Sequence, residues 1–527
     1  MLPLPPSGWC LPEAVPGAAG QSIHAWILEG RAGDTDAFPS LPDDQRRWPS
    51  GTIAFAAGTW DAVIASEAGT DTASEVGDLI LDVVAGAQAS EAGLVALYER
   101  LVAENALDYI DTMLTRLRRT GRLPKGRLRL LALWLVRLAS DRNPVKVGIA
   151  LLNVAGTAQD VDLLMEVGRH DEFTLYAVVA LRTLLTPERA RRAVWALAQA
   201  TSGWGRIQAV RRLGTDLEPE ISAWLLREGF RNRVEGTEVA HLVATTADLA
   251  GALGPPRIDR ALFRGAGDLL VALIHSPYKG IANYRDATVA TERYLRHARR
   301  MAADVDDLLA LSEIHSYLTR PRDQWRGTAG ARWPSAVRQR LIATATEILA
   351  EGRWEPMVVA QLASPDRRLF VAADRAAMYL GIGTFEAHMA RLEQGDWLSG
   401  WHWSSVLRQA PLGRLAELLR LAEERIQPEL IATGPALELG LGRQFERHRA
   451  VETVLRAVTK RQGMGRPFVL AALRSPVIRD RGVAARVLDG WDRRAWGPGL
   501  AEALRAAMLV EPDERNRDLM MRVLDGA

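Results

Sequence analysis

Cysteine is almost absent from this sequence, with Cys10 the single example in 527 residues. One thiol can form neither an intramolecular disulfide nor a cysteine-based zinc cluster, which excludes both as the basis of the fold. A chain so poor in cysteine fits a reducing compartment, and we expect a cytoplasmic protein.

Long hydrophobic runs are also missing. The most apolar stretch, residues 128–140, contains Arg129 and Arg137 and is too short to cross a bilayer. The N-terminus has no basic region ahead of its apolar residues and is interrupted by prolines, unlike a signal peptide. We therefore expect a soluble chain without a membrane partner.

The common motifs of catalysis are lacking as well. The chain contains no G-x-x-x-x-G-K-[ST], no H-E-x-x-H, no G-x-S-x-G and no C-x-x-C. Its nine histidines are scattered, and none stands three or four residues from another, the spacing that places two ligands on one helix face. We predict no catalytic residue, no cofactor and no metal, and we favour a protein that is not an enzyme.

No charge of one sign dominates. The chain has 66 basic and 64 acidic residues, a net charge of +2, which argues against binding nucleic acid through its whole surface. Two stretches are locally basic. Residues 116–142 contain nine basic residues and one acidic residue, Asp141, and residues 189–212 contain six arginines and no acidic residue.

These arginines have two interpretations. The first is solvated helix faces, and the second is a groove that follows a nucleic-acid backbone, provided that both stretches converge on one face. For the second interpretation the candidate contacts are Arg191, Arg192, Arg211 and Arg212.

What the sequence does contain is a repeat. Residues 475–490 and 511–526 are identical at eight of sixteen positions, at an offset of 36. Within the first copy Arg481, Ala484 and Leu488 stand at i, i+3 and i+7, which lie on one face of a helix. The second copy has Arg517, Met520 and Leu524 at these positions, and an earlier stretch has Arg206, Ala209 and Leu213.

Further blocks align on Ala150, Ala180 and Ala209, at spacings of 30 and 29 residues. From about residue 76 onward, short helical patterns alternate with short connections rich in Gly and Pro, and no β-branched strands come between them. The chain thus repeats a two-helix unit of about 30–36 residues. One hairpin of that size cannot bury its apolar face, so the units must stack.

The repeats resemble HEAT repeats, in particular the short HEAT-like repeats of phycobilisome lyases. Pro476, Arg481, Ala484 and Leu488 carry the resemblance, together with their counterparts 36 residues later. It is clear over 140–230 and 360–527, weak over 76–140 and absent over 1–75. The resemblance implies an all-α, right-handed α-solenoid of stacked antiparallel helix pairs that binds a partner on its concave face. It implies no reaction.

We expect four regions along the chain. Residues 1–75, rich in Pro, Gly and Trp, read as a small irregular N-terminal module of loops with short strands or helical turns. Residues 76–322 and 336–527 read as two solenoid segments. The Trp/Gly/Pro-containing residues 323–335 read as a break between them.

A cluster of aromatic residues is the other candidate contact surface. Residues 395–405 read GDWLSGWHWSS, in which Trp397, Trp401 and Trp403 surround His402. Such a cluster either packs a corner of the fold or anchors a partner, because aromatic side chains bury a large area at low entropic cost.

From these observations we expect a non-catalytic scaffold that binds another protein. The alternative is a nucleic-acid-binding solenoid, a DNA-repair enzyme among the examples, that uses the arginine-rich helices. A third reading assigns the function to residues 1–75.

Overall fold

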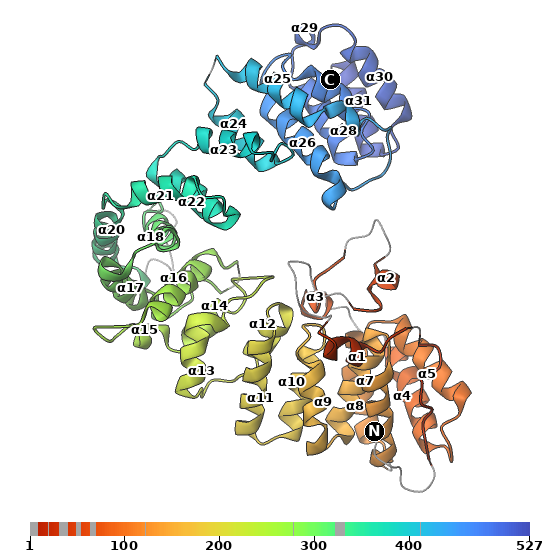
Figure 1. Ribbon diagram of the computed structural model, residues 1–527. Helices are drawn as coiled ribbons and strands as arrows, with labels where there is room; N and C mark the ends of the chain where they lie inside the picture. Colours follow the sequence, from red (N-terminus) through yellow and green to blue (C-terminus); the bar gives the residue numbers. More distant parts are fainter. Residues whose placement is uncertain are drawn as a thin grey trace. The chain divides into compact units, whose positions relative to one another are not determined.

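The computed structural model describes residues 9–18, 20–30, 41–48, 54–63, 70–121, 123–277, 279–321, 332–411 and 413–526. The regular elements formed by these residues are helices, as predicted (Figure 1). Among them the β-pairing is limited to one isolated parallel bridge between Glu438 and Val477. No described helix is both long and apolar enough to cross a membrane.

The chain divides into two compact units, each described here by itself. The first comprises residues 1–303 and 310–350, and the second comprises residues 304–309 and 351–527. Most of the predicted break, residues 323–331, lies outside the described residues.

The first unit is built from short helices joined by short connections. Its elements are α1 (Ile23–Leu28), α2 (Asp44–Arg47), α3 (Thr59–Val63), α4 (Thr70–Ala85), α5 (Glu91–Ala103), η2 (Ala106–Asp108), α6 (Ile110–Arg119), α7 (Lys125–Leu138), α8 (Arg142–Ala155), η3 (Ala158–Asp160), α9 (Val161–Val167), α10 (Thr174–Leu184), α11 (Pro187–Ala200), α12 (Trp204–Val210), α13 (Pro219–Trp224), η4 (Leu225–Gly229), α14 (Ala240–Thr246), α15 (Leu249–Ala252), α16 (Arg260–His275), α17 (Ala287–Met301) and α20 (Ser335–Leu349), together with all but the first turn of α18 (Val305–Leu318).

The second unit is likewise built from short helices joined by short connections. Its helices are α21 (Trp354–Leu362), α22 (Arg367–Leu380), α23 (Phe385–Glu393), α24 (Gly400–Gln409), α25 (Leu415–Ile426), η6 (Pro428–Ile431), η7 (Arg443–Phe445), α26 (Glu446–Val458), α27 (Arg466–Ala472), α28 (Ile478–Asp489), α29 (Arg493–Trp496), α30 (Leu500–Val510) and α31 (Glu514–Asp525). Local signals explain their ends. Asp366 caps α22 by accepting from the backbone N–H groups of Arg368 and Leu369, and Gly381 ends that helix at φ 67°.

Neighbouring helices pack as hairpins, and alternate helices pack side by side. In the first unit α8 contacts α10, and α10 contacts α12. The three aligned alanines, Ala150, Ala180 and Ala209, stand on these three helices and are all buried. In the second unit the same relation runs from α24 to α26, α28 and α31. The 29–36-residue spacing of the sequence is therefore the spacing of helices that touch.

The recurring arginine of the repeats holds the connection that precedes its helix. Arg481 is fully buried and donates to the carbonyl oxygens of Ser475 and Ala436, and it forms a bidentate ion pair with Glu511. Arg517 donates to the carbonyl oxygen of Glu511, also six residues before it. Arg206 donates to the carbonyl oxygens that end α11. Each guanidinium thus satisfies carbonyl groups that a helix end leaves without partners.

The described parts of residues 9–75 form three short helices and the start of α4, with no strand among them. They are attached to the first unit largely through buried charges on α8. Arg142 donates to the carboxylates of Asp43 and Asp44, with 2.8 Å between Arg142 Nη2 and Asp43 Oδ1. Lys146, which has no exposed surface, lies 2.7 Å from Asp61 and 2.6 Å from Glu172.

This group, named here the Lys146 cluster, comprises Asp43, Asp44, Asp61, Arg142, Lys146 and Glu172. Burial raises the pKa of Asp61 above its ordinary value, more than the nearby Lys146 lowers it. Burial would also raise the pKa of Glu172, but Lys146 and Arg142 outweigh it and hold that pKa below its usual range. The backbone N–H of Gly58 donates to Glu172 over 2.8 Å. Both cations of the cluster are buried, and each is paired with carboxylates of the same chain.

Candidate functional site

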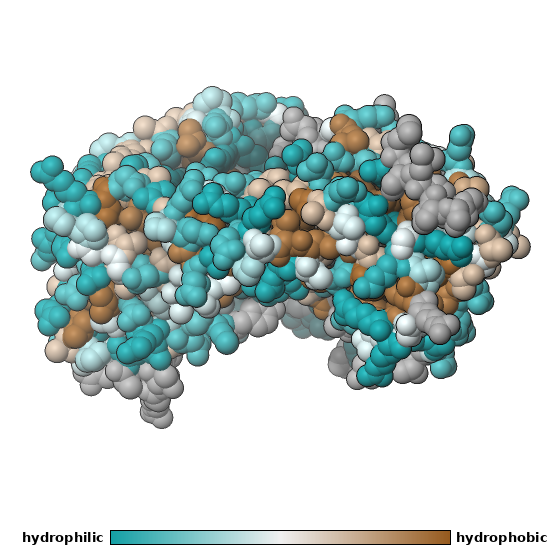
Figure 2. Space-filling model, turned by 90° about the horizontal axis from the view of Figure 1, so that it is seen from below, coloured by the Kyte–Doolittle hydropathy of each residue, from teal (hydrophilic) through white to brown (hydrophobic). Residues whose placement is uncertain are grey.

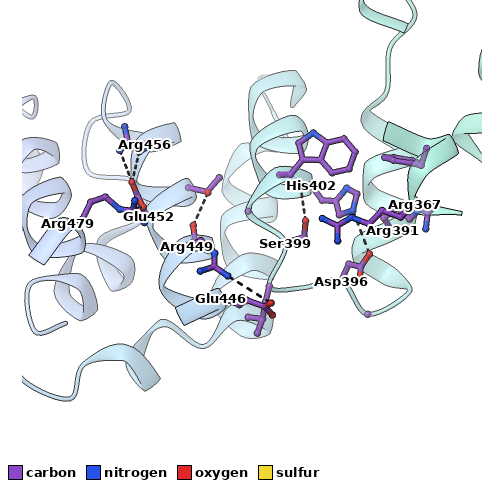
Figure 3. A pocket seen from close by; sticks show the side chains of 16 residues that line it. Arg367, Arg391, Asp396, Ser399, His402, Glu446, Arg449, Glu452, Arg456 and Arg479 are labelled. Atoms are coloured by element: carbon purple, nitrogen blue, oxygen red, sulfur yellow. Dashed lines mark hydrogen bonds and ion pairs between the residues drawn. The ribbon is translucent and has the colours of Figure 1, made fainter. Parts of the chain in front are cut away.

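A polar cavity of about 800 Å³ lies in the second unit, between α22–α24 on one side and α26 and α28 on the other (Figure 3). Two of the residues predicted from sequence, Trp401 and His402, line it. Phe370 and Leu398 contribute apolar surface, and the N-terminal turn of α24 adds Ser399 and Gly400. We call it the arginine cavity because five arginines line it: Arg367, Arg391, Arg449, Arg456 and Arg479.

Positive charge exceeds negative charge in this cavity. The five arginines face three carboxylates, those of Asp396, Glu446 and Glu452. Arg456 and Arg479 share Glu452, at 2.7 and 2.8 Å. Arg449 reaches Glu446 at 4.0 Å, the outer limit of an ion pair.

The two remaining arginines, Arg367 and Arg391, bring charge that no acid in the described residues neutralises. Arg391 donates to the carbonyl oxygens of Ser364 and Pro365 and lies over the ring of Phe370. Arg367 has no ion-pair partner among the described residues. The cavity thus offers an anion positive charge that no carboxylate of the described residues balances.

His402 connects the cavity to a buried chain of polar groups. Its Nδ1 lies 2.7 Å from Nδ1 of His388, and Nε2 of His388 lies 2.9 Å from Asp374 Oδ1. The three residues stand on consecutive helices, α24, α23 and α22, and each is buried. His402 Nε2 lies 3.7 Å from Asp396 at the cavity edge, too far for a hydrogen bond.

Burial sets the protonation of this group. Burial, together with the charge of His388, lowers the pKa of His402 to about 4. Burial alone would raise the pKa of Asp374, but hydrogen bonds from His388 and Thr384 hold it below its ordinary value. His402 is therefore a neutral imidazole at pH 7, and Asp374 is a carboxylate.

The fold keeps Trp397 and Trp403 together, with their ring centroids 6.3 Å apart, and places Trp401 at the cavity. Trp403 is fully buried and donates from Nε1 to the carbonyl oxygen of Trp397 over 2.8 Å. Trp397 precedes α24 and packs on the core of the second unit, under the guanidinium of Arg425. Trp401 stacks on His402 and meets Phe370 edge to face, at the cavity. Of the three tryptophans, Trp401 alone lines the arginine cavity.

The predicted arginine contacts have partners in their own unit. Arg191 pairs with Glu218 at 3.4 Å, and Arg211 pairs with Glu238. Arg212 donates to the side chain of Gln208, and its pKa is lowered by burial and by the charges of Arg211 and Arg182. Arg192 is exposed and lowers the pKa of Glu218 together with Arg191. Arginines of the other stretch are also paired, Arg129 with Asp160 and Arg142 with Asp43.

Sequence reasoning did not find His388 and Asp374. A search for histidines three or four residues apart detects pairs on one helix, whereas these residues come from successive helices. One signal was present: Asp374, His388 and His402 are spaced evenly, each 14 residues from the next. In a chain of short helical hairpins, that distance carries the chain from one helix to the next.

A second, apolar cleft of about 750 Å³ lies in the same unit. Its lining is dominated by small or apolar residues of η6, α27 and α30, with Glu423, Glu429 and Arg474 as its charged members: Pro428, Ala432, Gly434, Pro435, Pro467, Leu470, Ala471, Leu473, Ala503, Ala506, Ala507 and Val510. Large exposed apolar side chains stand in and beside these segments: Leu430, Leu437, Leu439, Leu441, Leu470, Leu509 and Val510.

Exposed apolar side chains that gather in one place mark interaction surfaces. Leu509 is 76% exposed and Leu437 is 62% exposed. On the face drawn in Figure 2, hydrophobic residues appear as patches among hydrophilic ones. We call the apolar lining and its exposed neighbours the leucine cleft.

No group of His, Cys, Asp and Glu in the described residues is arranged to hold a metal ion. The comparisons with known proteins give no family: no protein-family model, no curated protein and no solved structure matches this chain. The arginine cavity and the leucine cleft are therefore the two candidate functional sites.

Proposed function

We propose that this protein is an interaction scaffold, an α-solenoid of HEAT-like helix pairs whose second unit binds another protein. The leucine cleft is the observation that carries this proposal. Exposed apolar side chains cost solvation free energy in the isolated chain, and covering them with a partner recovers about 25 cal/mol per Å². Side chains as exposed as those of Leu437 and Leu509 are typical of recognition surfaces.

The shape and charge of the cleft favour an amphipathic helix as the partner element. The alanines of α27 and α30 leave room for a second helix to approach closely, as small residues do where helices cross. The leucines then surround its apolar face, in the helix-in-groove mode of recognition. Glu423 and Glu429 at the cleft favour basic residues beside that face.

The experiment is site-specific photocrosslinking. A photoreactive phenylalanine analogue replaces Leu509 in the full chain, and crosslinked proteins are identified by mass spectrometry and then purified for binding measurements. Leu470→Asp is expected to weaken binding of the purified partner by at least about tenfold, which corresponds to the loss of one buried anchor. Met378→Asp is the matched control, because Met378 is 66% exposed on α22 and does not line the cleft.

Equal binding by Leu470→Asp and the native chain would remove the cleft from the proposal. Nucleic acid as the sole ligand, released as salt rises, would favour the alternative expected from the arginine-rich stretches. The ion pairs of Arg191 and Arg211 argue against nucleic-acid binding through these arginines, because both already have acidic partners.

A further inference from the structure

A chain of hydrogen bonds leads from the arginine cavity into α22–α24, and the donor at each step can be deduced. At the inner end Gln409 accepts from the backbone N–H of Thr384 through Oε1 and donates from Nε2 to the Thr384 hydroxyl, both over 3.0 Å. This pair of bonds fixes the orientation of the Gln409 amide. The Thr384 hydroxyl therefore directs its own proton to Asp374, with which it is hydrogen-bonded.

The two imidazoles continue the chain. The Asp374 carboxylate only accepts, so His388 donates to it from Nε2 over 2.9 Å. In the neutral state His388 Nδ1 is then an acceptor, and the 2.7 Å contact requires that His402 donates from Nδ1. The remaining nitrogen, His402 Nε2, carries a lone pair and faces the cavity, where it lies 3.7 Å from Asp396 Oδ2.

A proton that arrives at His402 Nε2 need not leave its charge there. As Nε2 is protonated, the Nδ1 proton can pass to His388, which places the positive charge beside the Asp374 carboxylate. Burial disfavours charge on His402 itself, in agreement with its lowered pKa. The charged groups around the pair are Asp374 and Asp396, which favour proton uptake, and Arg391 and Arg408, which oppose it. The hydrogen bonds therefore orient an unprotonated Nε2 toward the cavity, and this geometry is the first requirement of a general base.

The same cavity selects for an anion. Arg367 and Arg391 have no carboxylate partner among the described residues, and Arg449 meets Glu446 only at 4.0 Å. Arg391 also lies over the ring of Phe370. Guanidinium groups bind phosphate oxygens through paired N–H donors and stabilise charge that develops on them. Figure 3 shows Arg367, Arg391 and His402 on one side of the cavity and Arg449 on the other.

From this juxtaposition we propose that the arginine cavity hydrolyses a phosphodiester, with His402 Nε2 as general base and the arginines as the binding site for the phosphate oxygens. A water oxygen forms a bond to phosphorus while Nε2 takes one of its protons. The bond between phosphorus and one ester oxygen breaks, and that oxygen leaves as an alcohol after it receives the proton from the relay. The products are a phosphomonoester and an alcohol.

In this assignment Asp374 and His388 are positioning residues, and His402 is the catalytic residue. The site is separate from the leucine cleft, whose lining shares no residue with it, so this proposal does not rest on the proposed scaffold function.

Nitrogen NMR of the histidine side chains tests the relay directly in the native chain. At pH 7 His402 is expected to show a protonated Nδ1 and an unprotonated Nε2. Asp374→Asn presents an amide donor to His388, which reverses the chain and moves the His402 proton to Nε2. A native chain with protonated Nε2 at pH 7 would overturn the proposal without recourse to any variant.

Hydrolysis is measured with bis(p-nitrophenyl) phosphate as the phosphodiester probe and p-nitrophenyl acetate as the acyl-ester comparison. We expect the native chain to release p-nitrophenolate from the phosphodiester. His402→Gln should lower kcat by about a hundredfold or more, as the loss of a general base does. Asp374→Asn should lower kcat with little change in KM, whereas Arg367→Gln and Arg449→Gln should raise KM.

Asp489→Asn, an exposed aspartate outside the cavity, is the matched control and should leave both constants unchanged. Thermal unfolding of each variant separates loss of fold from loss of chemistry. Absence of phosphodiester turnover, turnover of the acetate ester alone, or native kcat in His402→Gln would each refute the assignment. If the chain of Asp374, His388 and His402 has only a structural role, Asp374→Asn should change the stability of the protein. It should then not lower kcat selectively while KM stays the same.

Discussion

The Lys146 cluster of the first unit and the arginine cavity of the second differ in where their opposite charges come from. Lys146 and Arg142 are enclosed by four carboxylates of their own chain, three of them from residues 41–63. The arginines of the cavity have fewer carboxylates than guanidinium groups, and several are partly exposed. The first arrangement holds a segment in place, and the second leaves room for a ligand.

The comparison also shows why charge counts along a sequence mislead. The stretch 116–142 looks strongly basic because the acidic partners of its arginines lie elsewhere in the chain. Arg116 pairs with Asp78, Arg129 with Asp160 and Arg142 with Asp43. The arginines of the cavity are spread over more than a hundred residues, from Arg367 to Arg479, so no window of sequence reveals them.

Removing a cation from the Lys146 cluster is the most disruptive change we predict. Lys146→Met leaves Asp61 and Glu172 buried without their shared counter-ion, which should lower the free energy of unfolding by about 3–5 kcal/mol. Chemical unfolding followed by circular dichroism measures it. Arg46→Ala is the control, because the Arg46 side chain is 50% exposed and its pair with Asp141 should be worth less than about 1 kcal/mol. Equal losses in the two variants would contradict the comparison.

Acid should weaken the first unit through His170, which lies beside the cluster. His170 Nδ1 accepts from the backbone N–H of Glu172 over 3.3 Å, a bond that a proton on Nδ1 would break. Burial lowers its pKa to about 4, below the ordinary value near 6.5. The unfolded chain therefore binds this proton first as pH falls. Stability is complete above about pH 6.5 and declines towards pH 4, by at most about 3 kcal/mol.

The test is the slope of unfolding free energy against pH in the native chain and in His170→Gln. The variant should have a shallower slope between pH 6.5 and 4. His402, whose pKa is also lowered to about 4, contributes in the same sense in both proteins and so cancels from the difference. Parallel slopes would show that His170 is not responsible.

The smallest change in stability is expected at the arginine cavity. Arg367→Gln should shift the free energy of unfolding by less than about 0.5 kcal/mol, because no ion pair of the described residues is lost. Inorganic phosphate, titrated by NMR, should nevertheless bind more weakly, by about two- to tenfold. Arg456→Gln provides the contrast, since Arg456 already shares Glu452 with Arg479. A larger loss of phosphate binding in Arg456→Gln than in Arg367→Gln would show that pairing does not decide which arginines are available.

Much of the helical organisation was predictable, whereas the cavity was only partly so. The alternation of apolar residues and the aligned alanines mark helices locally, and Ala150, Ala180 and Ala209 do lie on helices that touch. Trp401 and His402 were noticed because they are neighbours in sequence. His388, Asp374 and the five arginines meet only when five helices pack, and no local period encodes that meeting. The leucines of 430–441 were missed because they lie in a segment with little regular structure.

The Arg481 side chain affects how the second unit unfolds. Arg481 bonds to Ala436, Ser475 and Glu511, so it ties together three connections that are up to 75 residues apart. The terminal hairpin α30–α31 cannot fray without withdrawing Glu511 from a fully buried guanidinium. Its amide hydrogens should therefore exchange with solvent at the same opening rate as those of α28, rather than at the faster rate usual for the last elements of a chain.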